Sequence, residues 1–324
     1  MNKIDAHIHF YGSHPDDIGL LRKLDIKLLN ICVADGPEGW EEQKRHYRSL
    51  SKQYPESYSW CTTFDPPRFI EKDSDYVERV IAGLSSDFDS GASACKIWKN
   101  IGMEVKRPDG EFIMVDDPLF RPIFEFIRES GRPVLMHIAE PLACWQPLDE
   151  SSPHYGYYKE NPQWHMYGRA GFPSHARLIA ARDRVLEAHP GVQFVGAHLG
   201  SLEYDLAEVA RRLDSYPNFT VDTSARMLDL MVQDSGAVRE FITKYSDRVL
   251  YGSDFVETND QTKCTPDERG RVVEELAETY NAEIAYLTDG GEMEYRGRHL
   301  DGLSLSTKVA EQVLTENAKR WYGI

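Results

Sequence analysis

The sequence has no long apolar run and no excess of basic residues. No stretch reaches the roughly 20 consecutive apolar residues that a membrane helix needs. The first ten residues, MNKIDAHIHF, lack the basic and apolar parts of a signal peptide. The formal net charge of −16 disfavours nucleic acid and anionic membrane surfaces as partners, because both bind basic faces. A local group of lysine and arginine can still bind a small anion.

Cysteine is sparse and shows no regular arrangement. The number is odd and no two cysteines form a CxxC pair, which is typical of a reducing compartment rather than of a disulfide framework. We therefore expect buried thiols in a cytoplasmic protein. The five residues are Cys32, Cys61, Cys95, Cys144 and Cys264.

Several catalytic motifs are also missing. GxSxG is absent and SxxK does not occur at a plausible nucleophile position, so covalent catalysis has no support. The segment after the first predicted strand is not a glycine-rich phosphate loop, which argues against the alternative of a doubly wound sheet.

What is present is an alternation of apolar, β-branched runs with amphipathic segments. Helical spacing occurs over 118–131, 175–191 and 204–217, and each segment ends at Gly or Pro. The eight predicted strands are 3–10, 26–34, 57–65, 92–100, 132–140, 192–200, 219–226 and 248–255.

Eight such strands with room for crossover helices predict an α/β fold, a (β/α)8 TIM barrel. A chain of 324 residues with 41% hydrophobic content can form it as a single domain, 1–324. Two additions are expected: a loop insertion after strand five, at 141–174, and a C-terminal extension, 256–324. In the extension we predict a helix near 266–281, a turn at 289–291 and a closing helix over 305–323.

Histidines and an aspartate occur at the ends of the predicted strands. His7 and His9 share one face of the first strand, and His137, His198 and Asp254 end the fifth, sixth and eighth. Strand C-termini meet at one face of such a barrel, where burying these groups without a cation would be costly. The alternative for the first pair alone is two surface histidines. Together, the five residues predict a metal site.

The type of ligand indicates which metal binds. Imidazole and carboxylate without cysteine suit zinc first, with manganese or iron as alternatives. Such an ion lowers the pKa of bound water and polarises a carbonyl oxygen, which is the chemistry of hydrolysis.

Five segments, taken in this order, resemble the amidohydrolase superfamily: DAHIHF, LMHIAE, VGAHLG, YGSDF and the closing LTENAKRWYG. The likeness is strongest to the amidohydrolase-related branch that includes aminocarboxymuconate semialdehyde decarboxylase. The resemblance covers essentially the whole chain and implies the same barrel.

The resemblance also implies a division of roles. His7, His9, His137 and Asp254 would bind the metal, and Asp254 would accept a proton from its water. His198 would act as an acid or base or as a further ligand. Asp5 is expected to be a supporting carboxylate at a strand end rather than a ligand.

Lys96 lies on the fourth predicted strand, where the two-metal branch of the superfamily carries a CO2-modified lysine that bridges two ions. The one-metal branch needs no such lysine, and we prefer an unmodified Lys96 that binds a substrate carboxylate. The alternatives are a second metal with carboxylated Lys96 and a buried structural ion pair.

Further substrate-binding residues are predicted from position. Strand alternation places Trp98 on the side of Lys96 and Lys99 on the other side. Arg226 ends the seventh strand and could bind a carboxylate or form a salt bridge to Asp222 or another neighbour. Lid candidates in the insertion are Trp145, Trp164 and His165, for which aromatic packing is an equal alternative.

The sequence thus predicts a metal-dependent hydrolase that attacks an amide, ester or lactone carbonyl of a small, anionic substrate. Decarboxylation or hydration by a lyase is the alternative within enzymes, because fold and metal site do not separate these reactions. A non-catalytic ligand-binding barrel is the alternative of another class, which the presence of both His198 and Asp254 disfavours. A homo-oligomer is compatible with the sequence.

Overall fold

The computed structural model describes residues 2–36, 39–68, 74–259 and 264–324 and contains the predicted barrel. Each predicted strand contains an observed one, so the eight-strand prediction is confirmed. The strands are β1 (Lys3–Phe10), β2 (Ile26–Ile31), β3 (Tyr58–Thr63), β4 (Cys95–Ile97), β5 (Val134–Met136), β6 (Phe194–Gly196), β7 (Phe219–Asp222), β8 (Val249–Leu250) and the short β9 (Val256–Glu257).

The strands form one parallel sheet in the order β8-β7-β6-β5-β4-β3-β2-β1-β9. The sheet closes because the segment from the end of β8 to β9 runs along β1. The amide of Ala6 donates to the carbonyl of Tyr251 at 2.9 Å, and that of Asp254 donates to the carbonyl of His7 at 2.8 Å. Further along, His9 pairs with Val256 of β9. This seam joins the first and last strands of the barrel.

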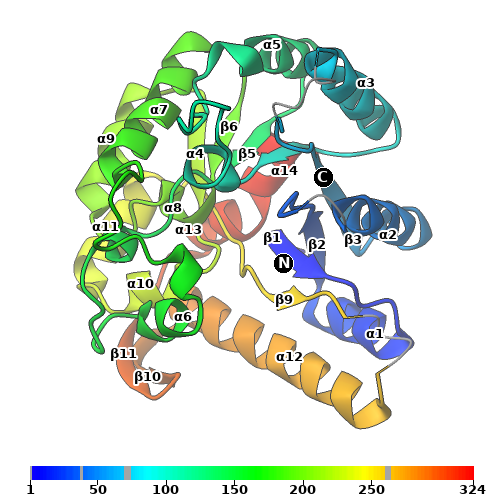
Figure 1. The fold of residues 1–324 in the computed structure, drawn as a ribbon. Coiled ribbons are helices and arrows are strands. Elements are labelled where there is room, and N and C mark those ends of the chain that lie inside the picture. Colours follow the sequence, from blue (N-terminus) through cyan, green and yellow to red (C-terminus); the bar gives the residue numbers. More distant parts are fainter. Residues whose placement is uncertain (1, 37–38, 69–73, 260–263) are drawn as a thin grey trace.

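Helices form a ring around the strands, with α12 lying along the side where β1 and β9 meet (Figure 1). The crossover helices are α1 (Pro15–Leu24), α2 (Trp40–Gln53), α3 (Tyr76–Asp89), α5 (Arg121–Glu129), α7 (His175–Ala188), α9 (Leu206–Ser215) and α11 (Ser235–Lys244). Short helical turns are α4 (Asn100–Met103), η1 (Pro118–Phe120), α8 (Ala197–Gly200) and α10 (Met227–Met231). Several helices begin at side-chain caps, such as Ser174 before α7 and Asp205 before α9.

The insertion after β5 contains short helices rather than a purely irregular loop. They are η2 (Leu142–Trp145), α6 (Tyr155–Glu160) and η3 (Pro162–Trp164). Cys144 anchors the insertion, since its carbonyl accepts hydrogen bonds from the amides of Met166 and Tyr167. Its thiol is buried, as are those of Cys32, Cys61 and Cys95.

The C-terminal extension contains the predicted helices but also strands that were not predicted. Helix α12 (Pro266–Thr288) begins at a capping box of Thr265 and Glu268 and is longer than predicted. The turn predicted at 289–291 is wrong, because β10 (Gly290–Tyr295) starts there and pairs with β11 (Arg298–Leu303). Residues 260–263 of the predicted extension lie outside the described residues.

The closing helix consists of α13 (Thr307–Glu311), the π-helical η4 (Gln312–Glu316) and α14 (Asn317–Tyr322). Its apolar side chains join a buried cluster with strand residues, among them Ala318 and Trp321 with Leu29, Leu135 and Val195. Asn317 donates to the carbonyl of Val249 at the start of β8. The closing helix therefore covers the N-terminal end of the barrel and leaves the opposite end for the site.

A register shift in β1 determines which side chains enter the barrel. Ile4 packs in the cluster inside the strands, whereas Ile8 packs in the larger cluster that includes the helices. The pairing with β2 is irregular between Asp5 and Ile8. Because a bulge reverses the alternation of faces, Asp5 and His7 point to opposite sides although they are two residues apart.

Among the described residues, no helix is both long and apolar enough to cross a membrane.

Candidate metal centre and active site

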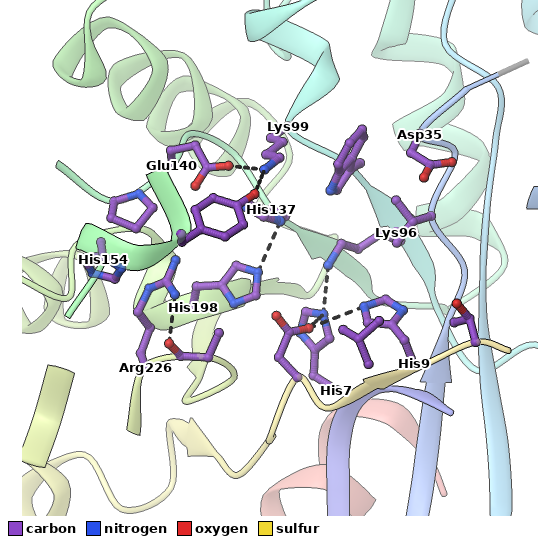
Figure 2. A pocket seen from close by; sticks show the side chains of 18 of the residues that line it. His7, His9, Asp35, Lys96, Lys99, His137, Glu140, His154, His198 and Arg226 are labelled. Atoms are coloured by element: carbon purple, nitrogen blue, oxygen red, sulfur yellow. Dashed lines mark hydrogen bonds and ion pairs between the residues drawn. The ribbon is translucent and has the colours of Figure 1, made fainter. Parts of the chain in front are cut away.

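A cavity of about 570 Å³ opens at the C-terminal ends of the strands. Figure 2 shows His7, His9 and Lys96 turned toward one another on one side and Lys99, Glu140 and Arg226 on the other. The predicted residues that the structure brings to this cavity are His7, His9, Lys96, Trp98, His137, His198, Arg226 and Asp254.

Hydrogen bonds fix the tautomers of His7 and His9. Nδ1 of His7 donates to Oδ2 of Asp222 at 2.8 Å, and Nδ1 of His9 donates to the carbonyl of Ile31 at 2.8 Å. Each ring therefore carries its lone pair on Nε2. These two Nε2 atoms lie 3.5 and 3.4 Å from the same oxygen, Oδ1 of Asp254. Three electron-pair donors thus meet at one point, the arrangement expected of metal ligands.

The ionisation of these groups suits a cation. Burial lowers the pKa of His7, and the nearby Lys96 lowers it further, so its ring is neutral. Burial would raise the pKa of Asp254, but its contacts with His9, His7 and His198 lower it well below its usual range, so the carboxylate is ionised. A neutral imidazole and an ionised carboxylate are the forms that bind metals.

Asp254 reaches this point because the chain after β8 is held close to β1. A Cβ atom at Gly252 would lie 2.9 Å from Cβ of His7, so only glycine fits there. Asp254 itself has a left-handed backbone, with φ 58°. Asp5 accepts hydrogen bonds from Ser253, from the amide of His7 and from Tyr280 on α12. It lies behind the cavity as a supporting carboxylate and is not among the residues that line it.

His137 and His198 form a second pair of rings. Nδ1 of His198 faces the carbonyl of Ser224 at 2.8 Å, so its Nε2 accepts from Nδ1 of His137 at 3.1 Å. This leaves Nε2 of His137 buried, with no hydrogen-bond partner among the described residues. An unpartnered buried lone pair is costly, and a cation would satisfy it. His137 is nevertheless outside the group of His7, His9 and Asp254 whose ligand atoms lie within 4.8 Å of one another.

Two buried cations reach the cavity, Lys96 from β4 and Arg226 from the segment between β7 and α10. Nζ of Lys96 lies 3.1 Å from Nε2 of His7, and burial lowers the pKa of Lys96 to about 8. Nε of Arg226 lies 3.7 Å from Oε2 of Glu203, and no ion pair joins Arg226 to Asp222 among the described residues. Asp222 instead orients His7.

Lys99 was predicted to face away from the cavity, and this is wrong. Strand β4 ends at Ile97, so the alternation of strand faces no longer applies at Lys99, which precedes α4. Its ammonium group forms a buried ion pair with Glu140 and lies 3.9 Å from the ring centre of Trp164. Lys99 therefore lines the cavity.

Three lid candidates do not line the cavity. Trp164 packs behind it, with its ring 5.5 Å from that of Trp98. Nε1 of Trp145 donates to the carbonyl of Pro173, and Nε2 of His165 contacts the carbonyl of Gln146. The insertion contributes other residues to the cavity, namely Pro141, His154, Tyr157 and Tyr158.

Sequence reasoning also missed Glu140 and Arg296. Glu140 is the last residue of the fifth predicted strand. Its position at a strand end, the criterion that selected His137, could therefore have identified it. Arg296 lies in the turn between β10 and β11, which is far from every strand end in sequence, so no comparable signal existed.

Comparison with known proteins gives a family and a set of similar folds. A family model described as amidohydrolase matches residues 91–324. A search of curated protein sequences finds no match.

Solved structures match over nearly the whole chain at low identity. One is 2,6-dihydroxybenzoate decarboxylase from Rhizobium (TM-score 0.56, 14% identity, 100% of this chain and 99% of that one). Another is 5-carboxyvanillate decarboxylase from Novosphingobium aromaticivorans, complexed with manganese and a nitrobenzoic acid derivative (TM-score 0.52, 15% identity, 97% and 81%). A third is a probable 2-pyrone-4,6-dicarboxylic acid hydrolase from Acinetobacter baumannii with citric acid bound (TM-score 0.52, 11% identity, 100% and 100%). These likenesses show the fold.

Proposed function

This chain belongs to the amidohydrolase family, and we propose that it is a metal-dependent hydrolase of a small carboxylate. One observation carries the proposal: Nε2 of His7 and Nε2 of His9 lie 3.5 and 3.4 Å from the same carboxylate oxygen, Oδ1 of Asp254. These residues would hold one divalent cation, with Nε2 of His137 as a further ligand. Such an ion lowers the pKa of water and polarises a carbonyl oxygen.

Other steps of the proposed reaction, proton transfer and substrate binding, would be carried out by side chains of the protein. Asp254 would take the proton of the attacking water at its carboxylate. His198 would hold or return a proton at Nε2, because its Nδ1 is committed to the carbonyl of Ser224. Lys96 and Arg226 would bind the carboxylate of the substrate.

Zinc is our first choice of metal, with manganese or iron as alternatives, and the ligand set of imidazole and carboxylate suits all three. Elemental analysis of the purified protein tests the number of ions. About one ion per chain supports an unmodified Lys96. About two ions, reduced to one by Lys96→Met, would support the carboxylated bridge instead.

Decarboxylation is the second candidate, supported by the likeness to two decarboxylases that act on aromatic carboxylates. Labelled water separates the two reactions. The metal-loaded protein is incubated in H2 18O with 2-pyrone-4,6-dicarboxylate, 2,6-dihydroxybenzoate or 5-carboxyvanillate. The masses of the products are then measured by mass spectrometry. Hydrolysis incorporates 18O into the organic product, whereas decarboxylation releases CO2 and does not. CO2 release as the only metal-dependent reaction would contradict the hydrolase proposal.

A further inference from the structure

The turn of the β10–β11 hairpin carries Arg296 to the mouth of the cavity. Tyr295 pairs with Arg298, so Arg296 and Gly297 form a two-residue turn, and both have a left-handed backbone, with φ 48° and 72°. Asn, Asp or Gly is preferred at the first of these positions. Arginine is a strained choice for the turn itself, and strain of this kind is often retained for function. The side chain of Arg296 lines the cavity, although the hairpin lies outside the barrel.

Contacts on two sides hold the hairpin in place. The hydroxyl of Tyr295 donates to Oε1 of Glu283 on α12 at 3.4 Å. The other oxygen of Glu283 accepts from Tyr251, which follows β8, at 2.8 Å. Arg298 donates to the carbonyl of Ser151 in the insertion at 3.4 Å. The turn is therefore positioned relative to both the barrel and the insertion.

The charges around the cavity leave Arg296 available for a ligand. Lys99 is paired with Glu140, and Lys96 and Arg226 are the cations proposed to bind the first carboxylate. Arg296 is exposed and forms no ion pair with a carboxylate in the parts of the chain that the structure describes. Glu283, which accepts from the neighbouring Tyr295, does not neutralise Arg296 at neutral pH, because burial raises the pKa of Glu283 to about 8.

We propose that Arg296 binds a second anionic group of the substrate, so that the site prefers dicarboxylates to monocarboxylates. The inference rests on the proposed function for the first carboxylate, which Lys96 and Arg226 would bind inside the cavity. Arg296 approaches from the hairpin and supplies a guanidinium group that pairs with a carboxylate through two parallel hydrogen bonds. It is thus a specificity-determining residue at the rim of the site.

The test measures binding to the metal-loaded protein by calorimetry and needs no turnover. The probes are benzoate and the three benzenedicarboxylates, with the carboxylates at 1,2, 1,3 or 1,4 spacing. Arg296→Asn is the main variant, because Asn suits the left-handed turn and the hairpin should remain folded. Arg296→Lys keeps the charge, and Lys308→Gln, which removes an exposed positive charge on α13 outside the cavity, is the matched control.

Wild type should bind at least one dicarboxylate about tenfold more tightly than benzoate. Arg296→Asn should abolish this preference without changing benzoate affinity, Arg296→Lys should restore part of it, and Lys308→Gln should leave it unchanged. No preference in wild type, or an equal loss for benzoate and dicarboxylates in Arg296→Asn, would overturn the proposal. Failure of the proposed function is recognised separately, as intact dicarboxylate selectivity in a protein that shows no metal-dependent hydrolysis.

Discussion

Strained residues gather where the chemistry is proposed. Nine described residues other than glycine have a positive φ, and six of them follow strands β5 to β8 at the cavity end of the barrel. They include His198 and Asp254, and the others are Ala139, Leu199, Ser201 and Ala225. Each such residue costs about 1 kcal/mol or more unless its surroundings enforce it. At His198 the carboxylate of Asp222 helps to enforce the left-handed backbone, since it accepts a hydrogen bond from the amide of His198 at 2.8 Å.

Asp254 should be essential for turnover but not for folding. Asp254→Asn keeps the size of the side chain and removes the negative charge and the proton acceptor, so we expect activity to fall by about a thousandfold or more. The circular dichroism spectrum should stay unchanged. Asp301→Asn, at an exposed position on β11 outside the cavity, is the matched control and should keep activity near wild type. Near-normal turnover in Asp254→Asn would refute the proposed role.

At the scale of elements, the strands were predictable because each is a short apolar run bounded by helix caps, Gly or Pro. Because the C-terminal ends of the strands meet at one face of the barrel, the sequence also predicted that four residues share one cavity: His7, His9, His137 and Asp254. The hairpin was not predictable, because its turn uses Arg296 where a turn residue was expected, while Gly290 and Gly291 gave a misleading signal. Lys99 was misplaced because periodicity cannot tell where a strand ends.

The Lys99–Glu140 pair joins the ends of β4 and β5 and should stabilise this wall of the cavity. Both side chains are 5% exposed, and the hydroxyl of Tyr158 in the insertion also donates to Glu140. Lys99→Met leaves a buried carboxylate without its cation and should lower the free energy of unfolding by about 3 kcal/mol. Lys99→Met with Glu140→Gln should recover much of this loss in urea denaturation.

A comparison with an exposed pair controls for loss of charge. Lys319 and Glu316 are 46% and 45% exposed, so Lys319→Met should change stability by less than about 1 kcal/mol. A similarly small effect of Lys99→Met would mean that the buried pair does not stabilise the wall.

Glu283 lies on α12 and contacts the β10–β11 hairpin through Tyr295. We expect it to make the free energy of unfolding depend on pH. Burial raises its pKa from 4.5 to about 8, so the folded protein favours the protonated form. The contribution of protonated Glu283 to the free energy of unfolding is complete below 4.5, the pKa of this group in the unfolded chain. It is lost as the pH rises through about 8, the pKa in the folded protein. Glu283→Gln mimics the protonated acid. It should match wild type near pH 5 and exceed it by a few kcal/mol near pH 8.5 in denaturant unfolding.

Glu292, exposed on β10, provides the control for this comparison, and Glu292→Gln should show no difference between the two pH values. If Glu283→Gln differs from wild type by the same amount at both, the carboxyl group of Glu283 does not titrate as argued.

For the whole molecule, the charge of the cavity opposes that of the surface. The chain carries a net charge of −16, yet the cavity is lined by four cations, Lys96, Lys99, Arg226 and Arg296, against three carboxylates, Asp35, Glu140 and Asp254. One of these carboxylates is proposed to bind the metal. Because salt screens distant charges more than near ones, the cavity can bind an anion within an acidic protein.

The proposed metal ligands also span the seam that closes the barrel, since His7 and His9 belong to β1 and Asp254 follows β8. A cation bound by both sides should stabilise the folded state by about 2.7 kcal/mol when present at about a hundred times its dissociation constant. Chelation should therefore lower the thermal midpoint by several degrees, and added zinc or manganese should restore it. The variant His7→Ala, His9→Ala should show no metal-dependent shift, whereas His299→Ala, exposed on β11, should behave as wild type. An unchanged midpoint of wild type after verified metal removal would mean that no ion links β1 to the end of β8.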